Sequence, residues 1–90
     1  MEERKFTREM VEGLIKSDML NFVIVSAISS DTLLCVKDCE ESIKVLTELE
    51  GVISEMDCKD KYLPHIRDGL DICRRDLDMF RKMEAKEDKQ

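Results

Sequence analysis

Apolar residues recur at intervals of three and four along much of the chain, a spacing that predicts amphipathic helices. The clearest case lies between residues 63 and 80. Its apolar residues share one helical face: Leu63, Ile66, Leu70, Cys73, Leu77 and Phe80. Pro64 falls near the start of this stretch, where a proline costs little because its missing N–H would have no partner. We expect a helix over about 61–72 and another over about 74–83.

The N-terminal part predicts one further helix, over about 7–16. Thr7 is a typical N-cap residue, with Glu9 in the first turn. Phe6 and Val11 have the spacing of a hydrophobic staple. Residues 1–6 are expected to be a flexible lead-in. Ser17 and Asp18 predict a cap for the helix that follows.

Residues 20–36 are ambiguous between helix and strand. The run Phe-Val-Ile-Val at 22–25 has strong strand propensity, and residues 32–36 could pair with it as a hairpin. Two isolated strands between helices would make a marginal sheet, however. A buried central helix explains the apolar character equally well. We favour the helix over 20–28.

The middle of the chain predicts two helices and a loop. Asp31 can cap a short helix over 32–36, and Asp38 can cap a longer one that ends near Gly51. Residues 54–60 are the most polar internal segment and are expected to form a loop. The charged tail, residues 84–90, is expected to fray.

These elements predict an all-α fold, a compact antiparallel bundle of about six short helices in one domain over 7–83. The 90 residues suffice for one small domain, and 42% hydrophobic residues suffice for a core. Only 3 Gly and 1 Pro occur, which favours helices with short connections. An alternative is a bundle of about three long helices, in which the apolar face from Leu63 to Phe80 runs unbroken through Cys73.

Charge and hydropathy limit the classes of partner that the chain is expected to bind. The net charge of −6 disfavours binding to nucleic acid, because an acidic surface repels phosphate. Residues 20–28 are too few to span a bilayer, so no membrane role is expected. No secretory segment precedes the four cysteines, which predicts a reduced, cytoplasmic protein. A mixed charged surface of this kind suits contact with another protein.

Three stretches resemble the death effector domain, a branch of the death-fold superfamily. Residues 62–77 look like its fifth helix running into the Arg-x-Asp-Leu signature, which is carried here by Arg74, Arg75, Asp76 and Leu77. Residues 20–25 (Leu-Asn-Phe-Val-Ile-Val) look like its second helix, and residues 43–53 look like its fourth. The resemblance covers about 7–83 and implies six helices.

The resemblance also implies a function and a set of site residues. Death effector domains are non-catalytic modules that bind other death-fold domains homotypically, as adaptors or regulators in apoptotic or inflammatory signalling. The resemblance implies that Arg74 and Asp76 present interacting charges, and that Phe22 lies in a partly exposed patch. As a residue of an apolar helix, Phe22 is more simply expected in the core. In the family an acid near the start of the second helix joins the charges. Here that position falls near Lys16, and the nearest acid is Asp18.

The alternative function is that of an unrelated acidic helical bundle, acting as a dimeric structural or regulatory factor. No enzyme, cofactor or metal site is predicted. Cys35 and Cys39 are spaced as half of a thiolate site, but cysteine is also a common small core residue. His65 is the only histidine, and no nucleophile with an identifiable acid partner accompanies it.

Overall fold

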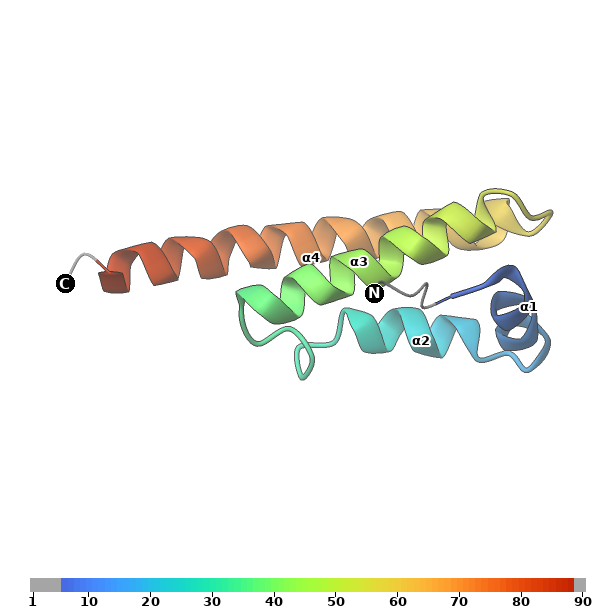
Figure 1. The fold of residues 1–90 in the computed structure, drawn as a ribbon, viewed down its shortest axis with the longest axis horizontal. Coiled ribbons are helices and arrows are strands. Elements are labelled where there is room, and N and C mark those ends of the chain that lie inside the picture. The colour runs from blue at the N-terminus through green and yellow to red at the C-terminus, as the bar shows by residue number, and fades with distance from the viewer. Residues whose placement is uncertain (1–5, 89–90) are drawn as a thin grey trace.

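The structure, a computed structural model, describes residues 6–88 and forms four helices within them (Figure 1). They are α1 (Arg8–Lys16), α2 (Leu20–Ala27), α3 (Val36–Ile53) and α4 (Lys59–Asp88). No strand occurs in this range, so the predicted all-α class is confirmed. The choice of helix over hairpin is confirmed for residues 20–27.

The long helices α3 and α4 pack antiparallel and form the centre of the fold (Figure 1). Each buries the stripe of residues that repeats at helical spacing, which removes apolar surface from water. The fully buried members are Cys39, Leu46, Leu49 and Ile53 on α3, and Ile66 and Cys73 on α4. Two ion pairs mark the register: Arg67 Nε lies 3.1 Å from Glu50, and Arg81 Nη2 lies 3.2 Å from Glu40.

The short helices α1 and α2 complete the core. Val11 of α1 and Leu20 and Ile24 of α2 are buried. The predicted N-cap is confirmed, because the Met10 N–H donates to Thr7 Oγ1 at 3.2 Å. Phe6, just before the cap, packs partly buried against the core.

The turn between α1 and α2 differs from the prediction. The Ser17 hydroxyl donates to the Gly13 carbonyl at 3.0 Å and so ends α1. Asp18 has a φ of 62°, the left-handed region that aspartate tolerates better than most residues. Met19 occupies the N-cap position of α2 and makes no side-chain cap bond. The prediction that Ser17 and Asp18 cap the second helix is therefore wrong.

The prediction of six short helices is also wrong, in two places. Residues 32–35 form an irregular loop instead of a helix, and the Thr32 hydroxyl donates back to the Ser26 carbonyl at 2.7 Å. The expected helices over 61–72 and 74–83 form the single helix α4. Residues 72–75 contain no glycine or proline, and Cys73 is fully buried, so a break there would disrupt the core.

Two helices extend further than predicted. Gly51 lies inside α3, which ends at Ile53, and α4 begins at Lys59, so that Pro64 is its sixth residue and still lies near its start. Helical backbone also continues to Asp88, through residues expected to fray. The lead-in expected over 1–6 falls almost entirely outside the described residues.

The C-terminal half of α4 makes the molecule elongated. Figure 1 shows its last turns extending past the beginning of α3. Side chains 81–86 are all exposed. The extents are 51 × 30 × 20 Å, and the radius of gyration is 14.6 Å. A compact chain of this length has a radius of about 12 Å. The end of α4 therefore projects from the bundle.

Gly69 is the point of closest approach between α4 and its neighbours. A Cβ placed there would lie 3.1 Å from Ile28 Cγ2 and 3.2 Å from Leu46 Cδ1. The same addition at Gly13 or Gly51 would meet nothing within 4 Å. All three glycines are helical, so only Gly69 has a packing reason to lack a side chain.

Replacement of these glycines by alanine separates helix propensity from packing. Gly51→Ala is expected to raise the free energy of unfolding by about 0.5 kcal/mol, through propensity alone. Gly69→Ala receives the same gain but must displace two side chains, so we expect it to be at least ~1 kcal/mol less stable than Gly51→Ala. Urea unfolding followed by circular dichroism measures both. Equal gains at the two positions would contradict the close packing.

Candidate protein-interaction surface

The helix α2 differs from the rest of the chain because it carries no charge. The protein has 21 acidic and 15 basic residues, yet none lies between positions 19 and 30. One side of α2 packs into the core through Leu20 and Ile24. The other side is exposed. It presents Phe22 at 65% exposure, Val25 at 51% and, at the N-cap position, Met19 at 45%.

These three side chains have the spacing i, i+3 and i+6, so they form one continuous stripe. We call them the α2 face. A helix that is apolar on all sides is normally buried on all sides. Single exposed apolar residues are common on proteins, but a contiguous group is characteristic of a binding surface. The α2 face therefore has the character of an interface without its partner.

A shallow groove adjoins the α2 face on the side of α3. Its apolar part comes from half-buried Val23 on α2 and Val45 on α3, with Ser26 beside them. Asp38 and Glu41 of α3 line the same groove. The Asp38 carboxylate accepts a hydrogen bond from the Leu34 N–H at 3.3 Å. The groove thus combines apolar surface with two carboxylates.

Two of the predicted site residues lie at this surface. Phe22 is exposed, as the resemblance implied. Asp18 is exposed in the turn that precedes α2. It belongs to no ion pair among those found in residues 6–88. Asp18 therefore leaves a negative charge at the N-terminal end of the α2 face.

Arg74 and Asp76 lie elsewhere and point in different directions. Residues two apart in an unbroken helix are about 200° apart around its axis. Arg74 is exposed, with Nη1 4.0 Å from Asp71 Oδ1. Asp76 is half-buried beside the Cys39 and Cys73 thiols, and its charge contributes to the raised pKa of both. The structure does not bring these two charges onto one surface.

The predicted site residues also fall in two separate groups along the molecule. Figure 1 places the turn between α1 and α2 near the end where α4 begins. Arg74 lies 15 residues after Lys59, the first residue of α4. That separation corresponds to about 22 Å along the helix. The structure therefore places Asp18 and Phe22 in one region, and Arg74 and Asp76 in another.

The cysteines divide into buried and accessible thiols. Cys39 and Cys73 are fully buried, whereas Cys35 is exposed at the N-cap position of α3. Burial raises the pKa of Cys73 to about 11, helped by the neighbouring Cys39 and Asp76. Within residues 6–88, no group of three or more His, Cys, Asp or Glu side chains could hold a metal ion. Of the two thiols with half-site spacing, Cys39 lies in the core and Cys35 is exposed.

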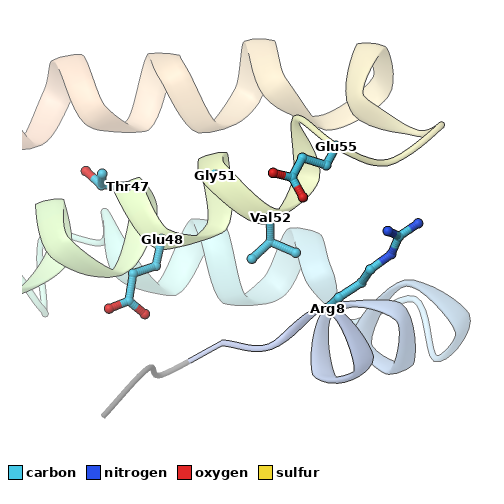
Figure 2. A pocket seen from close by; sticks show the side chains of 6 residues that line it. All are labelled: Arg8, Thr47, Glu48, Gly51, Val52 and Glu55. Carbon is cyan, nitrogen blue, oxygen red and sulfur yellow. The ribbon is translucent and has the colours of Figure 1, made fainter. Parts of the chain in front are cut away.

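A shallow hollow lies between the start of α1 and the outer side of α3. Figure 2 shows Arg8 of α1 on one side, with Glu48 on α3 and Glu55 in the turn just after α3. The rest of the lining comes from Thr47, Gly51 and Val52. This lining has no cysteine or histidine. His65 lies half-buried on α4 and is not among these residues.

Comparisons with known proteins give no family. No family model, curated protein or solved structure matches the chain. Among the described residues, no helix is both long enough and apolar enough to cross a membrane. The functional argument therefore depends on the surface itself.

Most of this surface was not predicted from the sequence. Phe22 and Asp18 were predicted site residues, whereas Met19, Val25 and the acids of the groove were not. The available signal was the lack of charge between positions 19 and 30 in a chain that is 40% charged. That lack, combined with a helical period, predicts apolar residues on the solvent side of the helix.

Arg74 and Arg67 offer a matched test of the charges on α4. The Arg74 pair is exposed and long, so Arg74→Glu is expected to change the free energy of unfolding by less than about 0.5 kcal/mol. Arg67 joins two helices through a less exposed partner, and Arg67→Glu places two carboxylates together. We expect the free energy of unfolding of this variant to fall by about 1 kcal/mol. Chemical denaturation measures both, and a larger loss for Arg74→Glu would contradict the assigned contacts.

Thiol reactivity tests the burial of the cysteines. Iodoacetamide at mildly alkaline pH is expected to modify Cys35 first, because a thiol must be accessible and deprotonated to react. Cys39 and Cys73 should react only after unfolding. Folding raises the pKa of Cys73 from its ordinary value of 9.0, so the folded state favours the protonated thiol. The resulting contribution to the free energy of unfolding is complete below pH 9.0 and is lost as the pH rises towards about 11. Peptide mass spectrometry identifies the modified sites, and early alkylation of Cys73 would contradict the packing of α3 on α4.

Proposed function

We propose that the chain is a non-catalytic protein-interaction module that binds its partner through the α2 face. The supporting observation is the stripe of Met19, Phe22 and Val25 on a helix without charge. Exposed aromatic side chains in such stripes are typical anchors of protein contacts. The adjoining groove adds carboxylates that would select a partner with basic residues.

The resemblance to death effector domains suggests the class of partner. On this proposal the module binds other death-fold domains homotypically and acts as an adaptor or regulator in apoptotic or inflammatory signalling. The exposure of Phe22 supports this interpretation. It rests otherwise on the sequence stretches 20–25, 43–53 and 62–77.

A second candidate is an acidic helical bundle that acts as a dimeric structural or regulatory factor. The continuous helix α4 favours it, because its apolar face runs through Cys73 without the junction expected in a death-fold domain. Both candidates use protein contact instead of catalysis. They differ in whether the partner is another domain or a second copy of the chain.

Photo-cross-linking in cells tests the proposed surface. A benzophenone amino acid at position 25 lies on the α2 face, whereas the same group at Thr47 lies on the exposed side of α3. We expect position 25 to give a discrete covalent adduct that is absent or weaker for position 47. Mass spectrometry of the adduct identifies the partner, and the mapped cross-link shows which of its residues lies at the surface.

The control adds Phe22→Asp to the position-25 chain. This change places a charge at an exposed position outside the core, so circular dichroism should stay helical while the adduct disappears. An adduct that survives Phe22→Asp, or equal labelling from position 47, would show that the α2 face is not the binding surface.

A further inference from the structure

The projecting end of α4 carries a second surface, which the proposed function leaves unused. Five residues lie within about 100° of the helix circumference. They are Arg75, Met79, Lys82, Met83 and Lys86. All five are exposed, and the two methionines reach 47% and 50% exposure. We call this set the α4 stripe.

The α4 stripe faces away from its own bundle. Cys73, Leu77 and Phe80 mark the side of α4 that packs on the core, and the stripe lies on the opposite side of the helix. Because α4 is one continuous helix, its end cannot fold back onto α2 of the same molecule. Any partner of this stripe must therefore belong to another molecule.

The charges of the stripe are opposite to those around the α2 face. The stripe contains three cations, of which Lys82 is paired with Asp78 at 3.1 Å. The α2 face is bordered by Asp18 in the preceding turn and by Asp31 in the following loop, and its groove is lined by Asp38 and Glu41. Carboxylates border an apolar centre on one surface, and cations border methionines on the other.

The apolar parts also suit each other. Methionine is unbranched and flexible, so it can fill an irregular hollow beside an aromatic ring, and sulfur contacts with aromatic edges are favourable. A three-turn helical stripe laid along the groove between α2 and α3 would cover Phe22 and Val23 with methionines. Its lysines and arginine could then reach the carboxylates of Asp38 and Glu41. This is the helix-in-groove mode of recognition.

We propose that the α4 stripe of one molecule docks on the α2 face and its groove in a second copy of the chain. The proposal rests on the proposed function and names the partner as a second copy. The two surfaces are different and lie on different sides of the molecule. Their contact is therefore heterologous, which leaves one free surface at each end and permits further copies to add.

Two variants remove one surface each. Phe22→Glu places a charge in the α2 face, and loss of a central aromatic anchor is expected to weaken association by about thirtyfold or more. The triple variant Arg75→Glu, Lys82→Glu, Lys86→Glu reverses the α4 stripe. It is expected to weaken association by about tenfold or more. All four positions are exposed, so circular dichroism should remain helical for both variants.

A matched control makes the same change in net charge at three positions outside the α4 stripe. Arg8→Glu, Lys59→Glu, Lys61→Glu also reverses three exposed cations, at the starts of α1 and α4. This control should associate like the wild type, although its net charge equals that of the stripe variant. Association of the wild type should also weaken with added salt, because the bordering charges are exposed.

Sedimentation velocity at increasing protein concentration is the decisive measurement. The wild type should form oligomers larger than dimers, and each variant alone should stay monomeric at the concentrations where the wild type first assembles. An equimolar mixture of the two variants should form dimers and nothing larger, because the intact stripe of one meets the intact α2 face of the other. This complementation is the signature of a heterologous contact.

Three results would overturn the inference. One is a wild type that stays monomeric at every concentration. Another is a dimer that Phe22→Glu abolishes and the stripe variant leaves intact, since that pattern indicates α2 packing on α2. The last is two monomeric variants whose mixture also stays monomeric. If the wild type stays monomeric but position 25 forms a photo-adduct with a different protein, the inference fails and the proposed function is still supported.

Discussion

The packing of α3 against α4 is the interaction on which the rest of the structure depends. Leu46, Leu49 and Ile53 on one helix meet Ile66, Leu70 and Cys73 on the other, and these residues form the central part of the buried core. Gly69 lies in this contact, where an added Cβ would press on Leu46. Helices as short as α1 and α2 are marginal alone in water, so they owe their stability to this platform. If α3 and α4 did not pack together, α2 would lose its support and the α2 face would not form.

The proposed function follows from the mismatch between the apolar composition of α2 and the burial of only one of its sides. A small domain has too little interior to bury an entire apolar helix. Here α2 places one side in the core and leaves Met19, Phe22 and Val25 in solvent. The projecting end of α4 gives the same molecule a cationic, methionine-bearing counterpart. Both features are unfavourable for an isolated monomer and are accounted for together by association.

Much of the fold could be predicted from the sequence. The helical period gave the all-α class, the buried face of α4, and the N-cap at Thr7. The prediction failed where a motif was given more weight than the local chain. The similarity at 74–77 suggested a helix junction, but a continuous buried face without glycine or proline favours one helix. The loop at 32–35 depends on the tertiary bond from Thr32 to Ser26, which no local pattern encodes.

The surface was less predictable than the core. Periodicity shows which residues share a side of a helix, but two apolar sides of one helix look alike in sequence. Phe22 was identified through a resemblance, whereas Val25 required knowledge of which side α3 and α4 cover. Arg74 and Asp76 were grouped by their proximity in the chain, yet the geometry of a continuous helix separates them.

Amide-resolved NMR at increasing protein concentration tests the central claim most directly, because it reports on each surface in the unmodified chain. The account predicts concentration-dependent shifts or line broadening at residues 19–26 of the α2 face and at residues 75–86 of α4. The exposed side of α3 around Thr47 should stay unchanged. Shifts spread evenly over the molecule, or confined to the outer side of α3, would contradict it.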